Sequence, residues 1–317
     1  MKRKVFLIVN LILAAVMVFS GTMCVYAAST TKMTEKPELR DDCTLKITYS
    51  SENKTFTGQN IKLWHIADIT DDAQYTLTGS FKDYPITVTG TTSQAEWNEM
   101  TVTLNSYILA DGIKADYESK TDSTGLAVFS DLTAGMYLVG SVRTEQDGKY
   151  YVFESFMVAV PGVGENGSWL YNVTAKPKMS ENVPSKGEVP YKVVKTWKDT
   201  GNAGKRPDSV IVEIYKDESL QESVTLNSEN NWMYSWKTVD DGSVWTVTEK
   251  NVPTEYRVGI QKNGDTFNVT NVHTSNETPP KTGDNSNITL YLVLMAVSGA
   301  TLIVLGVAQH RRRRHAE

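Results

Sequence analysis

Cysteine is nearly absent from this sequence, which holds two in 317 residues. Cys24 lies in an N-terminal segment that we expect to be removed, so Cys43 would be the only thiol of the processed chain. A single thiol cannot form the intrachain disulfides that commonly stabilise secreted proteins. A long-lived extracellular protein of this composition therefore needs another kind of crosslink.

Catalytic and metal-binding patterns are missing as well. His65 and His273 are isolated from each other and from any cysteine cluster, so the donor set of a zinc site is not present. We find no nucleophile motif, phosphate-binding loop or dinucleotide fingerprint. We therefore expect no cofactor, no metal and no enzyme activity.

The chain also lacks an excess of basic residues. It carries 32 Lys and Arg against 37 Asp and Glu, a formal charge of −5. Removal of both ends would take away seven basic residues but only two acidic ones, which moves the charge to −10. So acidic a chain does not suit nucleic acid as a partner.

The first residues have the layout of a secretory signal peptide. Three basic residues at 2–4 precede an apolar run over 5–19, and small residues follow at Ala27 and Ala28. The run is too short to span a bilayer comfortably. A signal peptide over residues 1–27 is therefore favoured over an N-terminal anchor.

The C-terminal end predicts a membrane span. Residues 288–308 are uncharged, and a helix of that length, at 1.5 Å per residue, measures about 30 Å, the thickness of the hydrocarbon layer. The tail at 309–317 contains four consecutive arginines, which hold that end on the cytoplasmic side. Everything before Ile288 is therefore expected outside the cell.

A pentapeptide before this span resembles the cell-wall sorting signal of Gram-positive surface proteins. It consists of Pro279, Pro280, Lys281, Thr282 and Gly283, an LPxTG-type motif with a proline in the place of the usual leucine. The resemblance implies that a sortase attacks the Thr282 carbonyl, releases Gly283 and passes the acyl group to an amine. It implies a pilin-type class C sortase, a housekeeping sortase and peptidoglycan as partners. The alternative is a plain single-pass protein.

Alternation of apolar and polar residues predicts an all-β fold with two tandem Ig-like β-sandwich domains. We expect a flexible N-terminus, a first domain, a linker, a second domain and a tether to the membrane, at residues 28–42, 43–178, 179–188, 189–273 and 274–287.

One helix is predicted inside the first domain. Between Ser93 and Ile113, apolar residues recur at spacings of three and four, which is typical of one helical face. They are Trp97, Met100, Leu104, Tyr107 and Ile108. Turns at 146–148 and at 263–264 predict β-hairpins, since Asp-Gly and Asn-Gly favour tight turns.

The second domain resembles the Cna B-type domain of surface adhesins and pilins over nearly its whole length. The similar segments include Lys-Thr-Trp-Lys-Asp at 195–199, Trp-Thr-Val-Thr-Glu at 245–249 and Val-Thr-Asn at 269–271. Such domains commonly form a spontaneous amide bond between a lysine of the first strand and an asparagine of the last, assisted by an acid. The resemblance assigns these roles to Lys195, Asn271 and Glu249.

Side-chain alternation supports this assignment. Strand residues two apart share a face, and Lys195, Glu249 and Asn271 each share a face with apolar neighbours. Burial lowers the pKa of a lysine and raises that of a glutamate, which leaves a neutral amine beside a protonated carboxyl that can polarise the asparagine carbonyl. That pairing suits attack with loss of ammonia. A hydrogen-bonded Lys–Glu pair without the bond is the alternative, and Lys192 is the other lysine considered.

The end of the first domain resembles the pilin motif of sortase-assembled pili. Trp169, Val173 and the Pro-Lys pair ending at Lys178 match the motif, whereas Ala175 and Lys176 replace its usual valine and tyrosine. The resemblance implies that Lys178 is the amine that accepts the sorting-signal threonine of a neighbouring copy. Repetition would give a covalent head-to-tail fibre.

These features together predict a structural subunit of a sortase-polymerised pilus, attached to the cell wall. Other copies of the chain are the principal partners, and host matrix proteins or glycans are candidates for an adhesive role. The alternative is a monomeric wall-anchored adhesin or an ancillary pilin.

Overall fold

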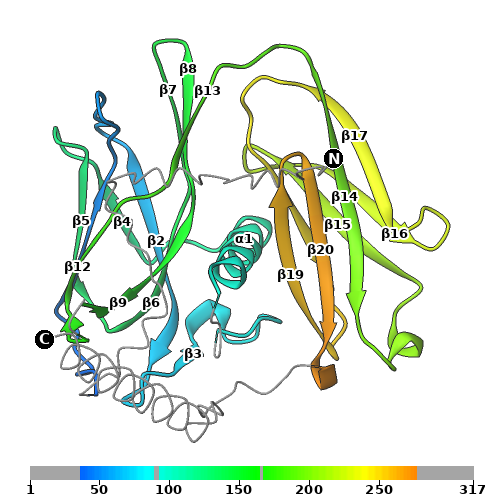
Figure 1. Cartoon of the computed structure of the whole chain (residues 1–317), viewed down its shortest axis with the longest axis horizontal. Coiled ribbons are helices and arrows are strands. Elements are labelled where there is room, and N and C mark those ends of the chain that lie inside the picture. Colours follow the sequence, from blue (N-terminus) through cyan, green and yellow to red (C-terminus); the bar gives the residue numbers. More distant parts are fainter. Residues whose placement is uncertain (1–35, 89–92, 165–166, 277–317) are drawn as a thin grey trace, which may run out of the picture.

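The computed structural model describes residues 36–88, 93–164 and 167–276. The described chain is mostly β, as predicted, and Figure 1 shows two lobes of strands with one helix between them. The predicted signal peptide, the sorting motif from Pro279 to Gly283, including Thr282, and the span over 288–308 lie outside the described residues. Within the three described ranges, no helix has the length and apolar character needed to cross a membrane.

The described part of the first domain contains three larger sheets and one two-stranded sheet. Their orders are β12-β1-β5, β13-β8-β7 and β3-β2-β6-β9, with β4 joined to β2, and β10 pairs with β11. The strands are β1 (Cys43–Thr48), β2 (Asn60–Ile69), β3 (Tyr75–Leu77), β4 (Tyr117–Lys120), β5 (Leu126–Leu132), β6 (Gly135–Val139), β7 (Val142–Gln146), β8 (Lys149–Phe153), β9 (Phe156–Val160), β10 (Gly162–Val163), β11 (Trp169–Leu170), β12 (Asn172–Ala175) and β13 (Met179–Asn182). The predicted hairpin between β7 and β8 is confirmed, with positive φ at Asp147 and Gly148.

The sheet that contains β2 and β6 is buried on both faces. Tyr137 and Val139 of β6 point into the domain core, whereas Met136 and Leu138 point to the opposite face and pack in a second apolar cluster. All five residues of β6 are buried. An unbroken apolar run is typical of a strand that is covered on both faces. The outer face of this sheet therefore needs a covering layer.

Helix α1 (Gln94–Ala110) provides that cover, and its predicted position is confirmed. It begins at a capping box, in which the Glu96 N–H donates to Ser93 Oγ at 3.2 Å and the Ser93 N–H donates to Glu96 Oε2 at 2.9 Å. Met100, Leu104 and Ile108 lie in the cluster formed with β2 and β6. Short 3₁₀ helices are η1 (Gly79–Phe81), η2 (Ala203–Lys205) and η3 (Thr274–Asn276).

The second domain is a sandwich of two sheets with the orders β17-β14-β20-β19 and β16-β15-β18. Its strands are β14 (Glu188–Lys198), β15 (Ser209–Lys216), β16 (Ser219–Asn227), β17 (Met233–Val239), β18 (Trp245–Lys250), β19 (Tyr256–Asn263) and β20 (Thr266–His273). The predicted turn at 263–264 joins β19 to β20. The first strand β14 and the last strand β20 lie side by side and parallel.

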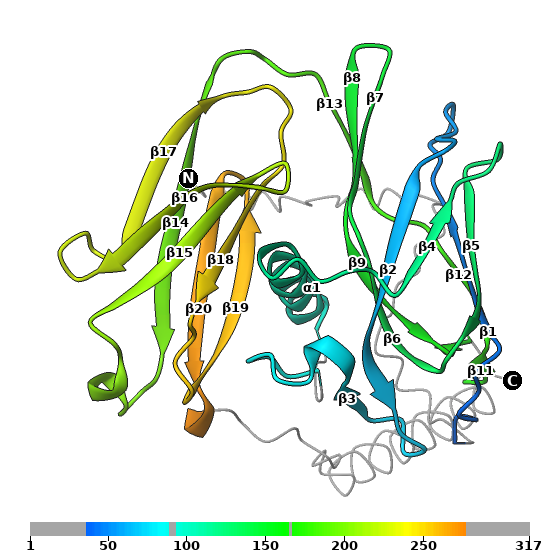
Figure 2. The ribbon, with the colours of Figure 1, turned by 180° about the vertical axis from the view of Figure 1, so that it is seen from behind.

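The two domains pack against each other. The sequence predicts two domains in series but no contact between them. Helix α1 lies between the lobes and contacts β18 and β19 of the second domain (Figures 1 and 2). A second contact joins the β7–β8 hairpin to residues 240–243, where a Cβ on Gly242 would lie 2.7 Å from the Tyr150 ring. Residues 179–182, which the sequence places in a linker, form β13 and pair with β8.

Candidate crosslinking site

Three buried polar side chains meet inside the second domain. Lys195 on β14 is 4% exposed, and Glu249 on β18 and Asn271 on β20 are fully buried. The register of the parallel strands places Asn271 opposite Trp197, which shares a face with Lys195. The amine and the amide therefore come from neighbouring strands of one sheet, and the carboxyl comes from the facing sheet.

Glu249 bridges the other two groups. Its Oε1 accepts a hydrogen bond from Asn271 Nδ2 at 2.7 Å, and its Oε2 lies 3.5 Å from Lys195 Nζ. Lys195 Nζ also donates to the Thr196 carbonyl oxygen at 3.1 Å and lies 4.0 Å from the centre of the Trp197 ring. The structure thus brings together the three residues that the sequence selects.

Burial shifts both ionisable groups of this cluster toward their neutral forms. It lowers the pKa of Lys195 to about 8, although the negative charge of Glu249 acts in the opposite direction. It raises the pKa of Glu249, although the charge of Lys195 and the hydrogen bond from Asn271 oppose the shift. A neutral amine beside a protonated carboxyl is a state that this site can hold.

Two atoms of the cluster lack hydrogen bonds among the described residues. They are Glu249 Oε2 and Asn271 Oδ1, both fully shielded. Unpaired buried polar atoms cost free energy and are rare in folded proteins. Here they are the oxygen nearest the amine and the carbonyl oxygen of the amide, the atoms that a reaction between the two groups would use.

The other lysine considered from the sequence lies outside this cluster. Lys192 lies on the opposite face of β14, because Val193 and Lys195 are the buried positions there. Lys195 is therefore the lysine that the fold places beside Glu249.

A second polar cluster in this domain keeps its charges. Arg206 donates two hydrogen bonds to the Asp199 carboxylate, at 2.6 and 2.5 Å, and the Tyr256 hydroxyl donates a third at 3.1 Å. The paired guanidinium lowers the pKa of Asp199. Asp199 belongs to the segment 195–199 that resembles the Cna B-type domain, but the sequence does not predict its pairing with Arg206.

Lys178 lies at the junction between β12 (Asn172–Ala175) and β13 (Met179–Asn182). Its side chain is exposed, and so is that of Lys176. Its backbone carbonyl accepts a hydrogen bond from the Glu154 N–H at 2.9 Å, which fixes the chain at this point. The predicted donor Thr282 lies outside the described residues, and the acceptor role of Lys178 stays a prediction.

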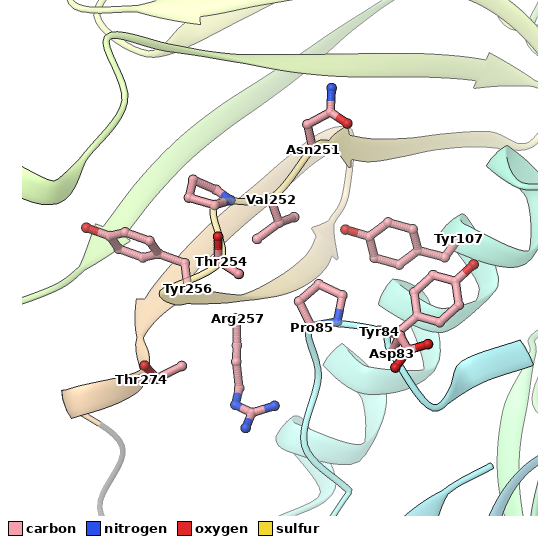
Figure 3. A pocket seen from close by; sticks show the side chains of 11 residues that line it. Asp83, Tyr84, Pro85, Tyr107, Asn251, Val252, Thr254, Tyr256, Arg257 and Thr274 are labelled. Atoms are coloured by element: carbon pink, nitrogen blue, oxygen red, sulfur yellow. The ribbon is translucent and has the colours of Figure 1, made fainter.

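The domain interface contains an open cleft of about 470 Å³. Figure 3 shows Tyr84 and Tyr107 of the first domain on one side of it and Val252 and Arg257 of the second domain on the other. Arg257 Nη1 donates to the Ile86 carbonyl oxygen at 2.8 Å across the interface.

In the described ranges no group of three or more His, Cys, Asp or Glu side chains is arranged to hold a metal ion, and Cys43 is buried and free.

Comparison with known proteins identifies the second domain. Residues 191–272 match the family model of the Cna protein B-type domain, which confirms the prediction for this segment. A collagen adhesin of Staphylococcus aureus is 32% identical over 123 residues, which cover 32% of this chain and 10% of that protein. The chain therefore spans about a tenth of the length of this curated relative.

Two of the solved structures that align with this chain are a Cna repeat and a backbone pilin. A single B repeat unit (B1) of the collagen-binding surface protein Cna of S. aureus aligns with 74% of this chain and 98% of its own, at 16% identity and a TM-score of 0.26. The T6 backbone pilin of Streptococcus pyogenes serotype M6 aligns with 74% of this chain and 65% of its own, at 14% identity and a TM-score of 0.33.

Proposed function

We propose that this chain, whose residues 191–272 form a Cna B-type domain, is a structural subunit of a sortase-assembled pilus on a Gram-positive cell surface. The observation that carries the proposal is the buried cluster of Lys195, Glu249 and Asn271. A buried lysine and glutamate are costly as ions, and a reaction between Lys195 and Asn271 would remove the charge of the lysine and give the permanent crosslink that a disulfide cannot supply here.

The reaction is an amide exchange between two side chains. Lys195 Nζ attacks Asn271 Cγ, so that an Nζ–Cγ bond forms and the Cγ–Nδ2 bond breaks. One proton passes from the lysine nitrogen through Glu249 to Nδ2, which leaves as ammonia. Glu249 suits this role because one of its oxygens is near the nucleophile and the other accepts from the leaving group.

The bond would join the first strand of the domain to the last. Because β14 and β20 are already neighbours, the crosslink needs no rearrangement of the sheet. It would restrict the unfolded chain and stabilise the domain by about 4 kcal/mol, as estimated for a closed loop of this length.

Intact mass spectrometry tests the bond. The two-domain chain should be lighter than its sequence mass by one ammonia, and Glu249→Ala or Asn271→Ala should restore the full mass. Asn268→Ala is the matched control, because this asparagine lies on the same strand but faces away from the core, and it should keep the loss. An unshifted mass for the wild-type chain would contradict the proposal.

Attachment to neighbouring copies would use two residues of the chain, Thr282 and Lys178. Thr282, with Pro279, Pro280, Lys281 and Gly283 as the sorting motif, would be the acyl donor. Exposed Lys178 would be the acceptor, a pilin-type class C sortase the catalyst, and a housekeeping sortase would join the fibre to peptidoglycan.

A monomeric wall-anchored adhesin is the second candidate, favoured by the identity with a collagen adhesin. Host matrix proteins or glycans would then be the ligands. Blots of wall extracts boiled in detergent distinguish the two, since a polymer gives a ladder of bands and a monomer gives one band.

A further inference from the structure

Helix α1 of the first domain covers one side of the second-domain sandwich. β18 and β19 are edge strands of the two sheets, and α1 packs against both (Figure 2). Edge strands expose unpaired backbone groups. Here the Ile260 N–H donates to Thr103 Oγ at 2.8 Å, and the Val258 N–H donates to the Pro85 carbonyl oxygen at 3.1 Å. The first domain thus completes the hydrogen bonding of β19.

Tyr107 of α1 contacts the candidate crosslinking site at Glu249. Its side chain is 8% exposed and packs in the core cluster of the second domain, although α1 belongs to the first. Its hydroxyl donates to the backbone carbonyl oxygen of Glu249 at 3.2 Å. Burial, aided by the nearby Glu249 charge, raises the pKa of Tyr107, so the hydroxyl stays protonated and remains a donor.

We propose that the first domain completes the crosslinking site of the second, with Tyr107 as a positioning residue that fixes β18 at Glu249 and excludes water from its carboxyl group. The inference rests on the proposed Lys195–Asn271 bond. It makes bond formation dependent on domain docking, so that only correctly assembled chains become crosslinked.

The physical reason lies in the position of Glu249 near the end of an edge strand. Glu249 is followed by exposed Lys250, and α1 packs along this edge of the sandwich through its contacts with β18 and β19. Water at the carboxyl group would stabilise the ionised form and lower its pKa. A decrease of one pKa unit leaves about tenfold fewer molecules with the proton that the reaction needs.

The test measures how fast the bond forms after folding. The two-domain chain is purified from inclusion bodies in denaturant, where the three side chains are apart, and refolded by dilution. Samples are quenched in acid, and intact mass gives the fraction that has lost ammonia, while tryptophan fluorescence follows folding. Wild type is compared with Tyr107→Ala and Tyr107→Phe. Tyr84→Phe is the control, because the Tyr84 hydroxyl donates to Asp111 of its own domain.

Tyr107→Ala should fold but lose ammonia about tenfold more slowly, because water reaches Glu249. Tyr107→Phe keeps the ring and should restore the rate to within about threefold of wild type, and Tyr84→Phe should match wild type. If the Tyr107 hydroxyl took part in the proton transfer itself, Tyr107→Phe should stay as slow as Tyr107→Ala.

A second variant leaves the core of the second domain intact. A Cβ at Gly259 would lie 1.8 Å from Oε1 at the flexible end of Glu99, so Gly259→Val should displace this side chain, loosen the contact between α1 and β19, and slow the reaction by a smaller factor than Tyr107→Ala. Wild-type rates in folded Tyr107→Ala and Gly259→Val would overturn the inference. No ammonia loss in wild type would instead overturn the proposed bond, so the two failures are distinguishable.

Discussion

Glu249 and Asp199 are two carboxyl groups of one domain whose surroundings shift their pKa values in opposite directions. Glu249 is fully buried beside Lys195, and burial raises its pKa although the charge of Lys195 opposes the shift. Asp199 is held by two hydrogen bonds from Arg206, and its pKa is lowered. Glu249 is therefore suited to hold a proton, and Asp199 is suited to hold a negative charge. The surroundings of each carboxyl group, and not the residue type, decide which form it takes.

Asp199→Asn should lower the free energy of unfolding by about 2 kcal/mol at neutral pH, because it breaks a partly shielded charge pair. The folded pKa of Asp199 is below its unfolded value of about 3.9, so the carboxylate stabilises the fold above that pH. The contribution is lost as the pH falls through the lower folded pKa.

Urea unfolding at about pH 7 and about pH 3 measures this effect, and the difference between wild type and variant should shrink in acid. Asp208→Asn is the control, since Asp208 is exposed, and it should change little at either pH. A difference for Asp199→Asn that is equal at both pH values would contradict the assignment.

Helix α1 has two buried stripes, and each serves a different domain. Met100, Leu104 and Ile108 pack on β2 and β6, whereas Thr103 and Tyr107 contact the second domain. Tyr107, which the apolar pattern included, is buried, but it packs in the core of the second domain. A helix between two domains needs polar and aromatic groups on its second side, because edge-strand backbone groups there require partners.

Thr103→Val should destabilise the two-domain chain by about 1–3 kcal/mol, because the buried Ile260 N–H loses its acceptor. Thr101→Val is the matched control. Both threonine hydroxyls donate to the carbonyl four residues earlier in the helix, at 2.8 Å for Thr101 and 2.7 Å for Thr103, but only Thr103 is bonded to the second domain. Chemical unfolding should show the larger loss for Thr103→Val, and equal losses would argue against the edge-strand role.

The described residues form one packed unit, in which Lys178 belongs to the first domain and the last strand, β20, to the second. If Lys178 and Thr282 are the attachment points, tension enters near β13 and leaves after β20. A Lys195–Asn271 bond would pass that tension directly from the first strand of the second domain to its last strand, since those strands are neighbours. The remaining strands of the sandwich would then carry little load.

Lys178→Ala should abolish the high-mass ladder in wall extracts and leave a folded monomer, because an exposed lysine contributes little to stability. Lys176→Ala is the control, since this lysine is also exposed and lies two residues away, and it should leave the ladder intact. Tandem mass spectrometry of the ladder should find Thr282 joined to the Lys178 side chain. A ladder that persists in Lys178→Ala would remove Lys178 as the acceptor.

The sequence by itself determined features that depend on short-range periodicity. Alternation along β14, β18 and β20 placed Lys195, Glu249 and Asn271 on inward faces, and local signals predicted α1 and the two tight turns. Those patterns are properties of neighbouring residues, because strand and helix geometry repeats every few positions.

Only the tertiary structure decided how the domains meet. The contacts from Tyr107 to Glu249 and from Thr103 to Ile260 join residues 142 and 157 positions apart. No local pattern marks such partners, since an edge strand can be completed by any segment that reaches it with the right donors and acceptors. The pairing of Asp199 with Arg206 and the incorporation of residues 179–182 into a sheet have the same origin, because both depend on which distant groups the fold brings into contact.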